Sequence, residues 1–222
     1  ATPLATVMNG PPLTCFPDDP LESALDLMGE RRVHRLYVVG AEPGRFTGVV
    51  SYTDVVALLY RYCRACARST TRKPASADGG PAERLSVKDV MTAAVVSLGA
   101  EAPLARVVEE LSAYRFGALL ITAGDGSPAG VVSKTDLIRA YRHGVPLEAD
   151  AGSVMTAPVA VWDQDAPLYQ ALQYMFLKDV QRLFVHAGGG ERIAGVLSLS
   201  DAARIRSGTC KACTLSRFVR DE

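Results

Sequence analysis

The 222-residue sequence contains one segment in three copies, and this repetition constrains the fold more than any other feature. Each copy opens on a Val-Met pair and continues with a Pro-Leu pair, whose Leu lies 13 residues after the Met. Each copy closes on a Gly-x-x-Ser-x-x-Asp phrase, and the spacing from Met to Asp is 46, 45 and 46 residues. The opening methionines are Met8, Met91 and Met155. Agreement to within one residue indicates three structurally equivalent repeats.

Within each repeat the spacing of apolar residues alternates between a helical and a strand period. After each Pro-Leu pair, apolar residues recur at i, i+3, i+4 and i+7, which predicts an amphipathic helix of about three turns. Two short apolar strands separated by a Gly-rich turn follow, at residues 36–39 and 49–50, 118–121 and 131–132, and 183–185 and 196–197. The closing Asp is expected to open a second helix, at 55–62, 137–141 and 202–205. The fold class is therefore α/β, with strand, helix, strand, strand and helix in each repeat.

The connections between the repeats divide the chain. We expect repeat 1 at 1–68, a linker at 69–85, repeat 2 at 86–143, repeat 3 at 152–206 and a C-terminal tail at 207–222. The linker is rich in Ser, Thr, Pro and Gly, whereas only about ten residues join repeats 2 and 3. Repeats 2 and 3 are therefore expected to form one module.

Composition and charge exclude several classes of protein. No apolar run approaches the roughly 20 residues that span a bilayer, so we expect no membrane span. The first ten residues lack the basic start and apolar stretch of a secretory signal, which favours a cytoplasmic location. The 24 basic and 24 acidic residues balance, so no global field favours nucleic acid. The sequence also lacks a nucleophile elbow, a phosphate loop and a dinucleotide fingerprint, and we do not expect an enzyme.

The repeated motifs resemble CBS repeats, which are named for the regulatory region of cystathionine β-synthase. The resemblance rests on the Val154–Val159 opening, the Pro-Leu-led helix, the His34–Val39 strand and the Gly-x-x-Ser-x-x-Asp closure. It covers residues 3–62, 87–142 and 152–206. It implies that repeats pair about pseudo-twofold axes into a Bateman module whose clefts bind AMP, ADP, ATP or S-adenosylmethionine.

The resemblance also implies ligand-binding residues in the closing motif. The Ser approaches the phosphate and the Asp accepts hydrogen bonds from the ribose hydroxyls, a role that suits a carboxylate because it only accepts. In this sequence the pairs are Ser51 and Asp54, Ser133 and Asp136, and Ser198 and Asp201. The alternative is that each Asp only caps the following helix. Thr53, Thr135 and Ser200, each preceding an Asp, are candidates for supplying that cap instead.

Positively charged residues before the first of the two short strands are candidates for phosphate contacts. His34 and Arg35 match the phosphate-contacting pair of the family in repeat 1, and Arg182 retains the Arg in repeat 3. Repeat 2 has Gly117-Ala118 at these positions, so its cleft lacks that charge. Each of these side chains is alternatively an ordinary solvated surface group.

Four of the five cysteines form two C-x-x-C pairs, Cys63 with Cys66 and Cys210 with Cys213. Each pair begins nine residues after the closing Asp of its repeat, so a pseudo-twofold relating repeats 1 and 3 would superpose the pairs. Four thiolates suit a closed zinc site, with an iron–sulfur cluster as the second choice. A redox pair or ordinary thiols remain alternatives, and Cys15 is expected to be a buried apolar residue.

The repeats together predict a regulatory module that senses an adenosine-containing ligand and acts on an unidentified protein. Three repeats leave one unpaired, as if a first repeat of four were missing, and this favours a homodimer. The alternative function is a metal-stabilised interaction or nucleic-acid-binding module. It rests on the two C-x-x-C pairs and on a basic cluster beside the first, formed by Arg61, Arg64, Arg68, Arg72 and Lys73.

Overall fold

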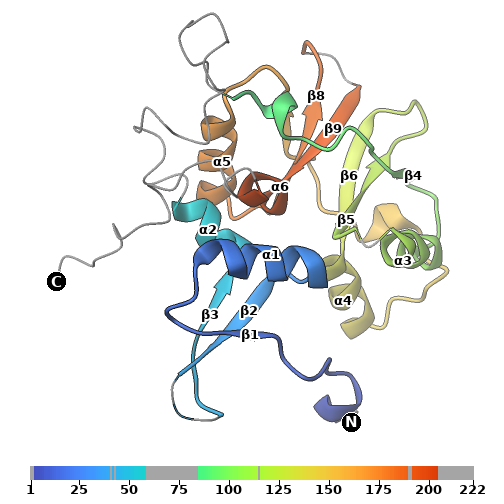
Figure 1. Cartoon of the computed structure of the whole chain (residues 1–222). Helices are drawn as coiled ribbons and strands as arrows, with labels where there is room; N and C mark the ends of the chain where they lie inside the picture. The colour runs from blue at the N-terminus through green and yellow to red at the C-terminus, as the bar shows by residue number, and fades with distance from the viewer. Residues whose placement is uncertain are drawn as a thin grey trace, which may run out of the picture. The chain divides into compact units, whose positions relative to one another are not determined.

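The computed structural model describes residues 3–40, 42, 44–58, 85–114, 116–189 and 192–204. These residues form the same succession of strand, helix, strand, strand and helix three times (Figure 1). The predicted α/β fold class is therefore confirmed. A short 3-10 turn precedes each repeat, at Leu4–Thr6 (η1), Val87–Asp89 (η3) and Ala151–Ser153 (η4).

The elements have nearly the same lengths in each repeat. Repeat 1 comprises β1 (Thr14–Cys15), α1 (Leu21–Arg31), β2 (Arg35–Val39), β3 (Phe46–Ser51) and α2 (Tyr52–Leu58). Repeat 2 comprises β4 (Ser97–Gly99), α3 (Leu104–Ala113), β5 (Ala118–Thr122), β6 (Pro128–Ser133) and α4 (Lys134–Arg142). Repeat 3 comprises β7 (Val161–Asp163), α5 (Leu168–Leu177), β8 (Arg182–His186), β9 (Ile193–Ser198) and α6 (Leu199–Arg204).

Each repeat folds its three strands into one small sheet with the same topology. The first strand pairs parallel with the second, and the second pairs antiparallel with the third, as β1-β2-β3, β4-β5-β6 and β7-β8-β9. The register shifts at the same place in every antiparallel pair, after Val38, Ile121 and Val185. The third strand of each repeat is therefore a sheet edge.

The second helix of each repeat begins earlier than the sequence predicted. It starts two residues before the closing Asp, at Tyr52, Lys134 and Leu199. In repeat 2 the N-cap of α4 is Ser133, whose side chain accepts a hydrogen bond from the backbone N–H of Asp136. Thr135, the candidate for this cap in repeat 2, does not supply it, because Ser133 is the N-cap residue.

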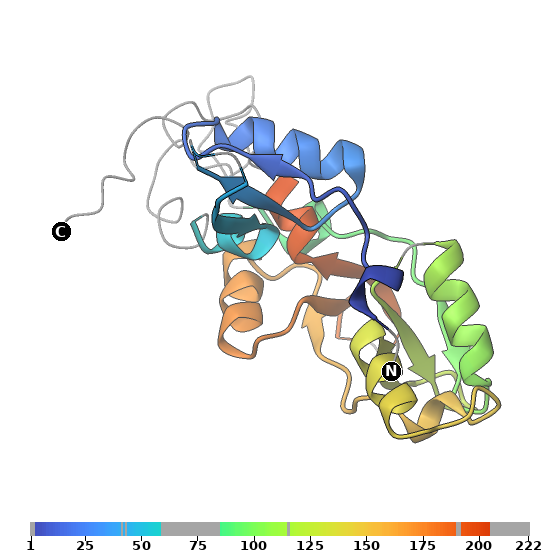
Figure 2. The ribbon, with the colours of Figure 1, turned by 90° about the horizontal axis from the view of Figure 1, so that it is seen from below.

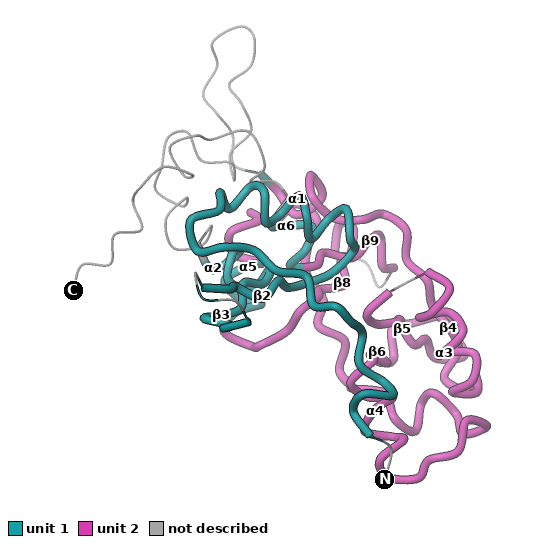
Figure 3. Tube along the Cα trace, turned by 60° about the horizontal axis from the view of Figure 1, so that its bottom comes forward, with its two compact units in different colours: residues 1–85, 172–176, 199–222 teal, residues 86–171, 177–198 magenta. Residues whose placement is uncertain are grey.

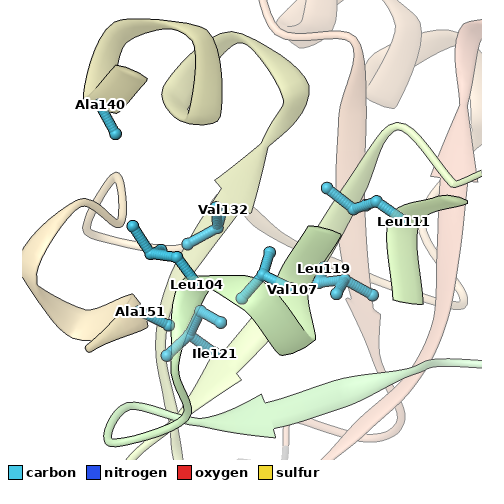
Figure 4. Close-up of a cluster of buried hydrophobic side chains, with 8 residues drawn as sticks. All are labelled: Leu104, Val107, Leu111, Leu119, Ile121, Val132, Ala140 and Ala151. Atoms are coloured by element: carbon cyan, nitrogen blue, oxygen red, sulfur yellow. The ribbon is translucent and has the colours of Figure 1, made fainter. Parts of the chain in front are cut away.

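The core of repeat 2 lies between its sheet and its amphipathic helix. In repeat 2, Leu104, Val107 and Leu111 of α3 pack with Leu119 and Ile121 of β5 (Figure 4). Helices α3 and α4 contact each other as well as strands of this sheet (Figure 2, green and yellow). The apolar residues whose spacing predicted this helix therefore form its buried face.

The described chain forms two compact units (Figure 3). Unit 1 combines repeat 1 with residues 172–176 of α5 and with α6, and helices α2 and α6 contact each other within it. Unit 2 combines repeat 2 with the sheet of repeat 3. Cys15 is buried in unit 1 as expected, and burial raises the pKa of its thiol. Within the described residues, no helix combines the length and apolar character needed to cross a bilayer.

Within unit 2, repeats 2 and 3 exchange backbone hydrogen bonds reciprocally. Thr92, which follows the opening of repeat 2, forms an antiparallel bridge with Val196 of β9. Thr156, which holds the same place in repeat 3, forms the equivalent bridge with Val131 of β6. The opening segment of each repeat thus pairs with part of the third strand of the other, which shields part of that edge.

Candidate functional site

The Ser-x-x-Asp motif folds into a tight turn in which the Asp accepts hydrogen bonds from the Ser. In repeat 1, Oδ2 of Asp54 lies 2.8 Å from the backbone nitrogen of Ser51 and 2.6 Å from its Oγ. In repeat 2, Oδ2 of Asp136 accepts the same two bonds from Ser133. One carboxylate oxygen is thereby used within the motif, because the Asp is the third helical residue and faces back toward the start of the helix.

The second carboxylate oxygen of Asp136 also has partners in the protein. The Thr156 hydroxyl donates to Oδ1 at 3.2 Å, and Nη1 of Arg139 lies 3.5 Å from the same oxygen. Asp136 is only 7% exposed, and it is the buried charged residue of the described chain. The carboxylate of Asp136 therefore bonds mainly to groups at the start of α4 and in the opening segment of repeat 3.

The other two aspartates lie in more open places. Asp54 is exposed, and Asp201 is half-buried in the first turn of α6. Ser198 ends β9 and Ser51 ends β3, so both serines lie at the same junction between strand and helix. A ligand would find a more accessible carboxylate at Asp54 or Asp201 than at Asp136.

The predicted phosphate-contacting arginines are cross-strand neighbours of the motif serines. Arg182 lies opposite Ser198 in the β8–β9 pair, and Arg35 lies opposite Ser51 in the β2–β3 pair. Directly paired residues in an antiparallel sheet project from the same face. Each Arg therefore lies beside the Ser of its own repeat on the same sheet face, as the proposed phosphate contact requires.

Arg182 also contacts repeat 2. A Cβ at Gly117 would lie 1.9 Å from Nη2 and 2.5 Å from Cζ of Arg182. The guanidinium therefore occupies the space that a side chain at position 117 would need. Gly117 precedes β5 and accepts a hydrogen bond from the backbone nitrogen of Lys134, the first residue of α4. The structure thus brings Arg182, Ser198 and the start of α4 together within unit 2.

His34 has a packing contact of its own. Its ring meets that of Tyr52 edge to face, with 5.8 Å between centroids. Both His34 and Arg35 are exposed. The charged end of β2 is therefore accessible, and the imidazole lies over the first residue of α2.

Sequence reasoning missed a cavity of about 340 Å³ in unit 2. It lies where β4, β5 and the β5–β6 turn meet the start of β9, and its lining includes Thr122, Asp125 and Arg192. Hydrogen bonds from Ser127 lower the pKa of Asp125 below its ordinary value. In the sequence, residues 125–128 indicate only a polar turn. Arg192, which adds a positive charge to the lining, comes from repeat 3 and is distant in the sequence.

The proposed metal ligands lie outside the described residues. This holds for Cys63, Cys66, Cys210 and Cys213, and for the basic cluster beside the first pair. Among the residues that the structure does describe, no group of three or more His, Cys, Asp or Glu side chains is arranged to hold a metal ion. The four-cysteine site therefore stays a prediction.

Comparison with solved structures identifies similar folds. An uncharacterized conserved protein from Pyrococcus horikoshii is 20% identical, with a TM-score of 0.66, over 90% of this chain and 81% of its own. The CBS domain protein PAE2072 from Pyrobaculum aerophilum, solved with AMP, is 26% identical, with a TM-score of 0.50, over 57% of this chain and 100% of its own. The CBS domain pair of protein MJ0100, solved with 5′-methylthioadenosine and S-adenosyl-L-methionine, is 17% identical, with a TM-score of 0.52, over 57% of this chain and 98% of its own.

Comparison of the sequence with other proteins gives one further result. No curated protein matches it significantly. The model of the CBS domain, however, matches residues 4–61, 87–143 and 151–208. These ranges coincide with the three repeats and include most of the chain. The chain therefore belongs to the CBS domain family.

Proposed function

We propose that this chain is a regulatory module that binds an adenosine-containing ligand, such as AMP, ADP, ATP or S-adenosylmethionine, at the closing motif of repeat 3. The observation that carries the proposal is the position of Arg182, beside Ser198 and against Gly117. A guanidinium held at the start of a strand next to a hydroxyl is suited to bind a phosphate or carboxylate.

The proposal gives each residue of the repeat 3 motif a separate task. Asp201 accepts hydrogen bonds from the two ribose hydroxyls, and Ser198 with Arg182 binds the charged end of the ligand. Asp201 is preferred to Asp136 because it is half-buried, whereas Asp136 is only 7% exposed. Ser133 then serves chiefly to cap α4. In repeat 1, Ser51, Asp54 and Arg35 form a second candidate site, to which His34 adds an imidazole that repeat 3 lacks.

The similarity to PAE2072 supports this class of ligand. That protein was solved with AMP, and its likeness to the present chain extends over its full length. The MJ0100 pair shares the fold and was solved with two other adenosine derivatives. We infer that the present chain acts by binding rather than by catalysis, because its sequence lacks the nucleophile and phosphate-loop motifs of the common enzyme classes.

The test is a thermal shift with a panel of AMP, ADP, ATP, S-adenosylmethionine and NADH, followed by calorimetry on the ligand that raises the melting temperature most. A ligand that binds only the folded state stabilises it by mass action. Asp201→Ala should weaken binding about tenfold or more, because two hydrogen bonds to a charged acceptor are lost. Glu109→Ala is the matched control, since Glu109 is an exposed carboxylate that pairs with Arg106 on α3. Equal affinity of the Asp201 variant and the wild type would reject the assignment.

A four-thiolate metal site is a second proposal, supported by one contact in unit 1. Helices α2 and α6 contact each other, and each precedes one of the two C-x-x-C pairs in the sequence. Zinc is the expected metal because it favours four soft ligands in a closed site. Cysteines must stay reduced to bind metal, and this suits a reducing compartment, so we propose a cytoplasmic location.

A further inference from the structure

The cavity in unit 2 lies away from the closing motifs of both repeats that line it. Strand β6 begins at Pro128, opposite Thr122 of β5, and ends at Ser133. Pro128 and Thr122 line the cavity, so it lies at the end of this sheet opposite the Ser-x-x-Asp turn. The lining from repeat 3 includes Ile193, the first residue of β9, whereas Ser198 is the last. The cavity is therefore distinct from the proposed adenosine-binding site.

One wall of the cavity is the sheet face of repeat 2 that is turned away from α3. Leu119 and Ile121 pack in the core with α3, so Leu120 and Thr122 project from the opposite face. Leu120 is 3% exposed and makes part of this wall apolar. Ser97 pairs with Leu120 in the β4–β5 ladder and lines the same space. The wall therefore combines an apolar surface with two hydroxyl groups.

Repeat 3 has bulkier side chains at the two hydroxyl positions. The strand registers make Val161 equivalent to Ser97, and His186 equivalent to Thr122. A valine and an imidazole would fill space that a serine and a threonine leave open. The room at the turn of repeat 2 thus depends on side chains particular to this repeat and not on the fold that the repeats share.

The β5–β6 turn holds a carboxylate in a fixed orientation at the cavity. The backbone nitrogen and Oγ of Ser127 lie 2.9 and 2.7 Å from Oδ1 of Asp125. These bonds lower the pKa of Asp125, so the carboxyl group is charged at neutral pH. Within the described part of the chain, no other residue bonds to Oδ2. This oxygen is available to a ligand.

A positive charge reaches the same cavity from repeat 3. Arg192 immediately precedes β9, is exposed and lines the cavity. Among the residues that the structure describes, none forms a hydrogen bond or an ion pair with its guanidinium, Asp125 included. The cavity thus has two opposite charges that do not neutralise each other. A guanidinium without a partner offers a fork of donors to a carboxylate, and a carboxylate oxygen attracts an ammonium group.

We propose that this cavity binds a small zwitterion of the amino-acid class, with its carboxylate on Arg192 and its ammonium group on Asp125. The volume of about 340 Å³ is near the lower end for ligand pockets, which suits a molecule of this size. A ligand with only one of the two charges would leave the other charge of the cavity unpaired. The site goes beyond adenosine binding at repeat 3 and does not depend on it.

The test is an NMR titration of the isotope-labelled full chain with the common α-amino acids, β-alanine and γ-aminobutyrate at millimolar concentration. We expect at least one of them to shift the amides of Gly126 and Ser127, which line the cavity, in a saturable manner. The matched acid without the amine, and the matched amine without the acid, should each bind about tenfold or more weakly, because one charged contact is lost. No saturable shift with any of these zwitterions, or equal binding of the acid alone, would overturn the proposal.

Two substitutions that remove charge test the assigned contacts. Asp125→Asn retains the oxygen that accepts the Ser127 bonds, and Arg192→Gln changes an exposed side chain, so both variants should fold. Each should weaken binding of the selected zwitterion about tenfold or more. The controls are Glu148→Gln and Arg142→Gln, which change exposed charged residues that do not line this cavity.

The adenosine-binding site supplies the last control. Asp201→Ala should leave zwitterion binding unchanged, and Asp125→Asn should leave the affinity for an adenosine-containing ligand unchanged. The failure of one site is therefore distinguishable from the failure of the other. Equal affinity of the wild type, Asp125→Asn and Arg192→Gln for the zwitterion would show that the cavity does not bind it and would overturn the proposal.

Discussion

Arg182 occupies the space beside Gly117, where a Cβ would lie only 1.9 Å from its Nη2 atom. This contact explains why repeat 2 departs from the pattern of the other two repeats. Repeats 1 and 3 have Arg35 and Arg182 at the start of the strand, whereas repeat 2 has Gly117-Ala118 there. A charged side chain at position 117 would clash with the guanidinium of Arg182. The small uncharged residue there therefore leaves the space that Arg182 occupies.

The first prediction is that Gly117→Val weakens the binding of an adenosine-containing ligand about tenfold. The new side chain displaces Arg182, and a charge-assisted hydrogen bond of roughly 1.5–3 kcal/mol is lost. Calorimetry with the ligand selected by the thermal shift panel measures the effect. Gly124→Ala is the control, because a Cβ at Gly124 has no neighbour within 4 Å. Arg182→Ala should cost as much as Gly117→Val, and the double variant should cost no more than either; additive losses would contradict a common cause.

The repeats, the fold class and the positions of the motifs could all be predicted from the sequence. The spacing of 46, 45 and 46 residues predicted three equivalent repeats that open at Met8, Met91 and Met155. The apolar period predicted the helices in which Met28, Leu111 and Met175 are buried. These features are local, since a helix and the strand after it are encoded by consecutive residues.

The functions of the motif residues depend on contacts between repeats and could not be predicted in the same way. The sequence marks Met155 and Gly130 as recurring, yet only the pairing of repeats shows that one packs on the other. The second helix was predicted to open at the Asp, because the usual cap rule was applied to the wrong residue of the motif. The partner of Asp136 in repeat 3, Thr156, lies 20 residues away and has no local signal.

The second prediction concerns the stability conferred by the two aspartates that are bonded to their motif serines. Asp136→Ala should lower the free energy of unfolding by about 2–3 kcal/mol, because it leaves the Ser133 N–H, the Ser133 hydroxyl and the Thr156 hydroxyl without their acceptor. Asp54→Ala should lower it by about 1 kcal/mol or less, since water replaces the exposed carboxylate. Urea denaturation of both variants measures the difference. Equal losses would show that burial of Asp136 contributes nothing.

The third prediction concerns the ion pair between Lys88 of η3 and Asp165, which links repeats 2 and 3. The hydrogen bond from Lys88 holds the pKa of the Asp165 carboxyl below its ordinary value, and the same bond raises the pKa of Lys88. A carboxyl whose pKa is lower in the folded state stabilises the fold above its unfolded pKa, and this contribution is lost as the pH falls through the folded value.

Carboxyl titration by NMR tests the pair directly. In Lys88→Met the titration midpoint of Asp165 should move upward toward its ordinary value. Asp125 is an internal control, because its pKa is lowered by hydrogen bonds from Ser127, which the substitution does not touch. Both groups are exposed, so the pair is expected to have a small effect on stability. An unchanged midpoint for Asp165 would mean that the two side chains are not paired in solution.

The last prediction is that Cys63, Cys66, Cys210 and Cys213 bind one zinc ion as four thiolates. A C-x-x-C pair places two sulfurs on one side of a turn, and two such pairs supply the four soft ligands of a closed tetrahedral site. The equal offset of the pairs from Asp54 and Asp201, together with the contact between α2 and α6, favours their convergence. Elemental analysis of protein purified without chelator or a metal-affinity tag should find about one zinc per site, and the double variant Cys210→Ser/Cys213→Ser should lose it. Cys15→Ala, which changes a buried cysteine outside the pairs, should retain the metal. A brown protein that absorbs visible light would indicate an iron–sulfur cluster instead, and metal well below one equivalent, or equal in the wild type and the double variant, would disprove the site.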